Sequence, residues 1–160
     1  MAAGATYSPI STTTLTTNQS SVTITSFSGY TDLVLIVAGL GSNFTSVALN
    51  FNSDAGSNYS RTVLDGNGTS ATSDRETSQT KMRVGVIDGS QGINIIQIMN
   101  YSNTTTNKTV LTRGSAAGNL ARASVGLWRN TAAITTLDIA PNSGTFSTGT
   151  TFTVYGISAA

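Results

Sequence analysis

The acidic side chains are the residues of this sequence with the clearest capacity for chemistry, because it contains no His and no Cys. Without those residues the chain cannot form a Ser-His-Asp triad, a Cys-His pair or a thiolate zinc site. A glycosidase needs two carboxylates that face each other at a defined separation, and no spacing among the acids demands such a pair. We therefore expect that the protein is not an enzyme and needs no cofactor. The acids are Asp32, Asp54, Asp65, Asp74, Glu76, Asp88 and Asp138.

One polar segment has the spacing of a calcium-binding loop. Asp65, Asn67 and Thr69 fall at its first, third and fifth positions, and Glu76 falls at the twelfth. Ser70 occupies the position at which such a loop needs glycine, and no helical pattern flanks the segment. The string Asp-Gly-Asn-Gly is also common in turns. The segment is thus a calcium candidate, and the simpler interpretation is a polar loop that holds no metal.

The low charge of the chain limits its partners. Charged residues make up only 9% of the 160 residues, against roughly 25% in an average soluble domain. The net charge is +1, so no long-range field attracts nucleic acid. The apolar run Leu33–Leu40 is too short to cross a bilayer, and the first residues lack the pattern of a secretory signal. We expect no nucleic-acid partner and no membrane insertion.

The elements that must position these side chains are strands. Apolar residues fall into short runs between turn signals, and the segments 21–27 and 47–51 alternate apolar with polar residues. Leu33–Val37 is apolar at every position, which predicts a central strand covered on both sides. The pattern predicts an all-β domain over residues 1–160, a two-sheet β-sandwich of jelly-roll type with about ten short strands. Phe152 and Val154 should share one face of the last strand, and are buried if that face is the inner one.

Two segments are candidates for contact with other proteins. Pro9 predicts that residues 7–15 form an edge strand, since proline cannot donate a hydrogen bond to a neighbouring strand. Residues 1–9 could form an N-terminal arm, and residues 65–79 lack apolar support and are interpreted as an exposed loop. Neutral Ser and Thr faces cost less to desolvate than charged ones, which favours self-association. The contact candidates are Ala2, Tyr7, Pro9, Arg75 and Arg83.

Four aromatic residues have two interpretations. Tyr30, Tyr59, Tyr101 and Trp128 could stack on a sugar ring, as aromatic faces do in carbohydrate sites. Large aromatic residues are more often found in a core, and that is the alternative.

Five strings, taken in order, resemble a known group of proteins. They are Tyr30–Val37, Phe51–Ser60, Asn100–Val110, Val125–Arg129 and Phe152–Ile157. Together they are similar to small structural proteins of tailed bacteriophages, including cyanophages, whose chains end in a related Phe-x-Leu-Tyr-Gly-Ile string. This sequence departs by carrying Val154 where that string has Leu. The resemblance covers residues 7 to the end and implies a virion component with a β-sandwich fold and no catalytic motif.

Two functions are compatible with that resemblance. The first is a capsid decoration or cement protein on the outer surface of the virion, a homotrimer or other homo-oligomer that clamps subunits of the major capsid protein. The second is a tail-fibre or head-fibre domain that binds host-surface glycan through the four aromatic residues.

Overall fold

The computed structural model describes residues 6–118 and 120–158, which form twelve strands and no helix. No helix in these ranges could therefore cross a membrane. The strands are β1 (Tyr7–Thr14), β2 (Val22–Ile24), β3 (Asp32–Gly39), β4 (Thr45–Phe51), β5 (Tyr59–Gly66), β6 (Ala71–Gln79), β7 (Met82–Ile87), β8 (Gly92–Ile98), β9 (Lys108–Ala116), β10 (Leu120–Trp128), β11 (Leu137–Pro141) and β12 (Thr151–Ile157).

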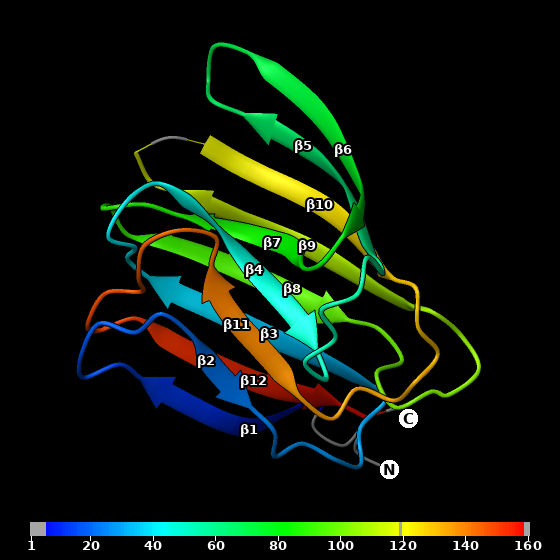
Figure 1. The fold of residues 1–160 in the computed structure, drawn as a ribbon. Coiled ribbons are helices and arrows are strands. Elements are labelled where there is room, and N and C mark those ends of the chain that lie inside the picture. The colour runs from blue at the N-terminus through cyan, green and yellow to red at the C-terminus, as the bar shows by residue number, and fades with distance from the viewer. Residues whose placement is uncertain (1–5, 119, 159–160) are drawn as a thin grey trace.

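The strands form two antiparallel sheets that pack face to face (Figure 1). The larger has eight strands in the order β1-β12-β3-β8-β9-β10-β5-β6, and the smaller has four in the order β2-β11-β4-β7. Without β5, β6, β9 and β10, two four-stranded sheets remain, β1-β12-β3-β8 and β2-β11-β4-β7. The chain switches repeatedly between them, as it does in an eight-stranded jelly roll. The expected all-β, jelly-roll-like sandwich is confirmed.

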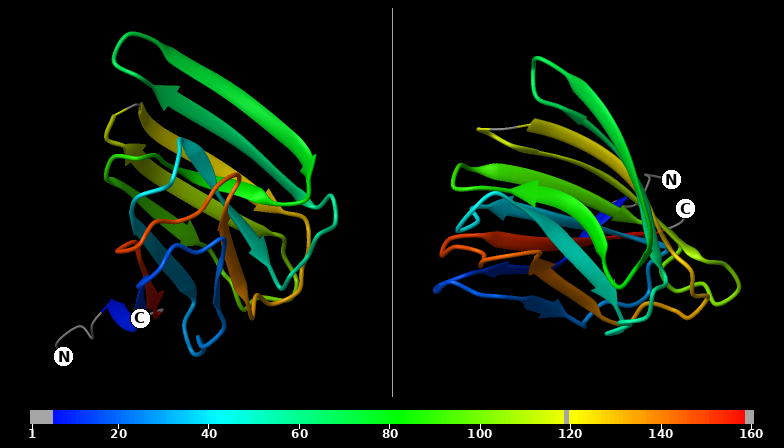
Figure 2. Two further views of the ribbon diagram at one scale, coloured as in Figure 1. Left: turned by 60° about the vertical axis from the view of Figure 1, so that its left-hand side comes forward. Right: turned by 45° about the horizontal axis from the view of Figure 1, so that its top comes forward.

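Two hairpins are inserted into this jelly roll. The hairpin β5–β6 lies between β4 and β7 in the chain, and β9–β10 lies between β8 and β11. Both extend the larger sheet on one side, as the run β9-β10-β5-β6. The β5–β6 hairpin stands at the top of Figure 1, past β7 at the edge of the smaller sheet, and the second view in Figure 2 shows the same overhang. The larger sheet is therefore wider than the layer that covers it.

The core lies between the two sheets. On β3 the alternate residues Leu33, Leu35 and Val37 are all fully buried against the smaller sheet. On the closing strand β12, Phe152 and Val154 are also fully buried, so they share the inner face as predicted. The ring of Phe152 meets that of a second buried phenylalanine, Phe146, edge to face at 5.0 Å.

A buried amide ties the two layers together. The side chain of Asn94 on β8 accepts a hydrogen bond from Val86 N and donates one to Val86 O, both at 2.9 Å. These backbone groups belong to β7, where the pairing with β4 shifts register between Val47 and Ala48. Gly114 makes room for the amide, because a Cβ at that position would lie 2.3 Å from Asn94 Oδ1. The interaction satisfies buried backbone groups, which are costly to leave without partners.

Three expectations about these elements were wrong. Residues 65–79 are not one exposed loop, because Ala71–Gln79 is strand β6, whose backbone pairs with β5. An edge strand exposed on both faces needs no apolar residues, so its sequence lacks the expected pattern. Residues 7–9 belong to β1 rather than to an arm, and Ala2 lies outside the described residues. The strand Leu33–Val37 is central, but only one of its sides is covered by the chain's second sheet.

Candidate functional site

The side of the eight-stranded sheet that points away from the smaller sheet is the candidate site, here called the open face. Residues alternate between the two sides of a strand, so the neighbours of each buried core residue point outward. From β12 to β5 the open face consists of Tyr155, Thr153, Thr151, Val34, Ile36, Ala38, Gln97, Ile95, Ile93, Leu111, Arg113, Ser115, Val125, Ala123, Ala121, Thr62 and Leu64.

Aliphatic side chains dominate the open face, and several are exposed to solvent. The exposed fractions are 61% for Leu64, 50% for Val125, 45% for Ile93 and 38% for Leu111. Leu111 and Val125 lie opposite each other on β9 and β10, and Leu64 lies one strand further on β5. A contiguous apolar surface of this kind marks a contact site for protein, membrane or ligand.

One cation lies within this aliphatic surface. Arg113 on β9 is in register with Ile95 on one side and Ala123 on the other. Its side chain is exposed, and it makes no ion pair with any residue of the described ranges. The nearest acid of the same side is Asp32 at the start of β3, whose Oδ1 accepts a hydrogen bond from Asn100 N at 2.6 Å. Arginine among apolar groups is typical of protein interfaces.

On the inner side of the same sheet, apolar residues give way to ion pairs where the smaller sheet ends. Arg61 of β5 donates to Glu76 of β6 through Nε at 2.7 Å, and Arg83 of β7 reaches the other oxygen of Glu76 at 2.9 Å. Further along the hairpin, Arg122 binds both oxygens of Asp65 at 2.7 Å. The Arg122 guanidinium holds the pKa of Asp65 below its ordinary value. Charged pairs thus occupy the inner side as soon as the apolar cover ends.

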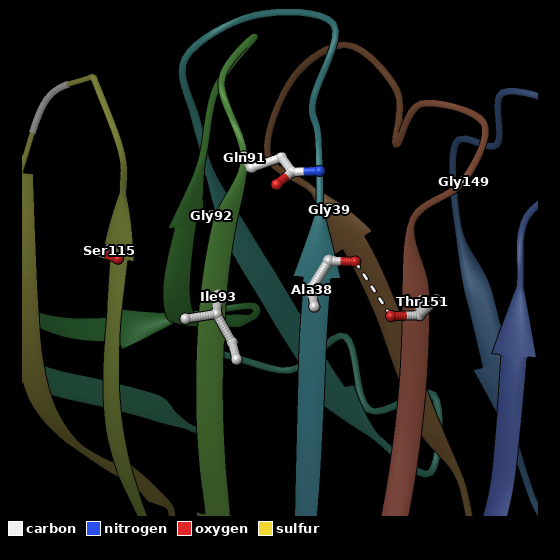
Figure 3. A pocket seen from close by; sticks show the side chains of 8 residues that line it. All are labelled: Ala38, Gly39, Gln91, Gly92, Ile93, Ser115, Gly149 and Thr151. Carbon is white, nitrogen blue, oxygen red and sulfur yellow. Dashed lines mark hydrogen bonds between the residues drawn. The ribbon is translucent and has the colours of Figure 1, made fainter.

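Two shallow hollows indent the open face. The first, about 310 Å³, is lined mainly by apolar groups, with Leu64, Leu111, Ala123 and Val125 among them. The second, about 460 Å³, crosses the ends of β12, β3, β8 and β9, where Ala38, Ile93 and Thr151 surround it (Figure 3). No aromatic or charged residue is among those that line the second hollow. Neither hollow has the set of converging polar groups that fixes the orientation of a small ligand.

The structure does not bring the calcium candidates together. Asp65 is bound to Arg122, while Glu76 lies opposite Arg61, several positions away along the hairpin. Asn67 Oδ1 accepts hydrogen bonds from Thr69 N at 3.0 Å and Ser70 N at 2.8 Å, which closes the turn between β5 and β6. Within residues 6–118 and 120–158, no group of three acidic side chains is placed to hold a metal ion.

Three of the four glycan candidates are in the core. Tyr59 is fully buried, and Tyr101 and Trp128 are 3% and 1% exposed. Tyr59 and Trp128 stack with ring centroids 6.3 Å apart, so their faces meet each other rather than a sugar. Tyr30, partly buried, packs against the core. These positions correct the proposed glycan contacts and place the residues according to the alternative interpretation.

Polar partners satisfy the buried aromatic residues. Trp128 Nε1 donates to Asp54 Oδ2 at 2.7 Å, and the Asn58 side chain donates to the same oxygen at 2.9 Å. Hydrogen bonds from Asn58 and Trp128 lower the pKa of Asp54. Burial raises the pKa of Tyr59 to about 12. Asp54, to which the sequence assigned no role, thus stabilises the core by accepting the hydrogen bond of the buried Trp128.

The described contact candidates lie far from one another. Tyr7 is 53% exposed on the edge strand β1, and Pro9 is exposed two residues further. Arg75 is exposed on β6, at the opposite edge of the sheet, and Arg83 is engaged by Glu76. The residues that sequence reasoning missed are those of the open face on β8, β9, β10 and β5. The sequence signal that could have found them is that these strands carry apolar residues at the positions of both alternating sets, and not at one set alone.

Comparison of the chain with protein-family models, with curated proteins and with solved structures finds no match.

Proposed function

We propose that this chain is a structural protein of a tailed-bacteriophage virion, most simply a capsid decoration protein that stabilises the shell by binding major capsid subunits. Its place would be the outer surface of the capsid, with self-association into a small oligomer. The observation that carries the proposal is the open face, which is aliphatic over most of its width and is not covered by the smaller sheet. The virion context comes from the resemblance of five strings in the sequence.

The remaining features agree with an architectural role. Most of the acids hold the fold together: Asp54 supports Trp128, Asp65 binds Arg122 and Glu76 binds two arginines. Asp138 accepts hydrogen bonds from Thr23 at 2.9 Å and from Ser53 at 3.0 Å. Carboxylates held in this way are unsuited to general acid–base work, which needs a positioned and reachable proton acceptor. The glycan-binding alternative loses three of its four aromatic contacts to the core.

Quantitative mass spectrometry of purified virions tests the location and the role. A decoration protein should be present in hundreds of copies per particle, whereas a handful of copies would point to a fibre, and none would overturn the proposal. A second measurement concerns the open face. Val125→Asp should reduce incorporation into particles, because a charge in a desolvated apolar contact is costly. Thr13→Asp, at an exposed position of the edge strand β1 opposite Phe152, is the control and should be incorporated normally.

A further inference from the structure

The open face is apolar although the same chain places charged pairs on the inner side of the sheet, at the limit of its cover. Past β7 the inner side carries Arg61, Glu76, Asp65 and Arg122, all paired with one another or with Arg83. In contrast, the part of the open face between β12 and β5 holds two charged side chains, Arg113 and, at its border, Asp32. A surface so poor in charge is stable in water only at a cost, which contact with another apolar surface removes.

The size of the open face suits an ordinary protein interface. Eight strands spaced about 4.8 Å apart, each contributing about six residues at about 3.3 Å, give a surface of about 770 Å². A specific interface of standard size buries about 800 Å² on each partner. The whole face is thus large enough for one stable contact.

Charge complementarity identifies the occupant. The open face carries the cation of Arg113 on β9, and its border carries the carboxylate of Asp32 on β3. The two lie two strands and four residues apart in the register, which is about 16 Å, too far to pair within one molecule. Between them on β8 lies Gln97, in register with Val34 of β3 and Leu111 of β9. Because Gln97 is the midpoint, a two-fold axis that passes over it, parallel to the sheet and perpendicular to the line from Arg113 to Asp32, brings Arg113 of each molecule over Asp32 of the other.

We infer that the open face binds a second copy of this chain about such an axis, with two reciprocal Arg113–Asp32 ion pairs flanking a contact of aliphatic side chains. A symmetric contact needs a surface that is complementary to itself, and the cation, the acid and the midpoint between them meet that condition. Asp32 keeps one oxygen for the partner, because only its Oδ1 accepts the hydrogen bond from Asn100 among the described residues. The inference rests on the proposed contact role of the open face and refines it: the occupant of this face is a second copy of the chain rather than a capsid subunit, and the oligomer is a pair rather than the expected homotrimer.

Light scattering coupled to gel filtration, over a dilution series of the purified chain, gives the first result. The wild type should show a mass of about 33 kDa at high concentration, twice the 16.4 kDa of the chain. Arg113→Glu should dissociate the pair by placing two carboxylates together, and Asp32→Lys should do so by placing two cations together, each weakening association at least about tenfold. Asp74→Lys, at an exposed position on the inner side of β6, is the control and should keep the wild-type mass. Far-UV and near-UV circular dichroism check that each variant is folded.

A mixture of the two variants tests whether Arg113 of one molecule pairs with Asp32 of the other. Each homodimer repels itself, but the heterodimer of Arg113→Glu and Asp32→Lys contains two attractive pairs, so an equimolar mixture should recover the mass of a dimer. A mixture that stays monomeric while the wild type pairs would overturn the inference. The same holds for a wild type that is monomeric throughout or that forms a trimer of about 49 kDa, three times the 16.4 kDa of the chain.

A second variant tests the axis without changing a charge. The chain has no cysteine, so Gln97→Cys introduces the only thiol. Two such thiols on the two-fold axis should be joined by a short bismaleimide, because sheets that pack face to face lie about 10 Å apart, beyond the roughly 7 Å between Cα atoms that a disulfide can span. Thr62→Cys, on the same face but away from the axis, is the control. No covalent dimer of Gln97→Cys, or equal yields for both variants, contradicts the inferred axis.

A monomeric protein that still enters virions through its open face would leave the proposed function intact, whereas normal incorporation of Val125→Asp would remove it.

Discussion

The two sides of the eight-stranded sheet differ in the residues that they carry at and beyond the limit of the second layer. On the inner side of the β5–β6 hairpin, beyond the smaller sheet, Arg61 and Glu76 replace the aliphatic residues found under the cover. On the open side, Leu64 of the same hairpin is 61% exposed. Where its second layer ends this chain uses paired charges, so exposed aliphatic residues on the other side of the same sheet support the proposal of a partner.

The largest effect on stability is expected for a substitution on the covered inner side of the sheet. Phe152→Ala should lower the free energy of unfolding by about 3–5 kcal/mol, because the fully buried ring leaves a cavity against Phe146. Urea denaturation of both proteins measures the difference. The matched control is Phe44→Ala, whose ring is 51% exposed and should cost well under 1 kcal/mol. Equal costs for the two variants would contradict the assigned core.

An intermediate effect is expected on the inner side beyond the cover. Glu76→Gln leaves Arg61, which is 6% exposed, and Arg83 without their carboxylate. The loss should be about 2–3 kcal/mol, somewhat less than for a fully buried pair because the Glu76 side chain is 17% exposed. Asp74→Asn on the same strand is the control, since Asp74 is exposed and makes no ion pair within the described ranges. Thermal or urea unfolding should leave that control within about 0.5 kcal/mol of the wild type.

The pH dependence of stability distinguishes the inner side of the sheet, where carboxylates are held by partners, from the aliphatic open face. The pKa of Asp54 and that of Asp65 both lie below the ordinary value of 3.8 in the folded protein. Their stabilising contributions are therefore complete above that value and are lost as the pH falls below it toward the folded pKa values. Urea denaturation in a pH series should show the free energy of unfolding decreasing below pH 3.8. Asp54→Asn and Asp65→Asn should each flatten this decrease, and an unchanged slope in both would contradict the assignment.

The smallest effect on folding is expected on the open face. Leu64→Ala should change the free energy of unfolding of the monomer by no more than about 0.5 kcal/mol. Leu35→Ala, the same substitution at a fully buried position of β3, should cost about 2–5 kcal/mol. Denaturation at high dilution makes the comparison on the monomer. A large cost at Leu64 would mean that the open face is part of the fold rather than a contact surface.

The sequence predicts the sandwich because local alternation and apolar runs are recorded in the strands themselves. Pro9 marked the edge strand, and Phe152 and Val154 were correctly assigned to one face. Strand β6 was missed because an edge strand exposed on both faces is held by backbone pairing with β5, which leaves no pattern in its side chains. The open face was missed as a surface because its residues come from strands far apart in sequence. Which side of Leu33–Val37 the second sheet covers depends on the order of the strands, and no single strand contains that information.

The edge formed by β6 limits how this protein can polymerise. If β6 paired with β6 of a second molecule in antiparallel fashion, acidic side chains would meet. A register centred on Arg75 sets Asp74 against Glu76, and a register centred on Asp74 or on Glu76 sets that residue against its own copy, which is repulsive. At the other edge, Pro9 and the adjacent bulge interrupt the backbone donors of β1. The sheet therefore cannot grow easily by pairing further strands with its edges, as amyloid does. The protein can in this way carry a broad aliphatic face on a sheet whose two edges oppose fibril growth.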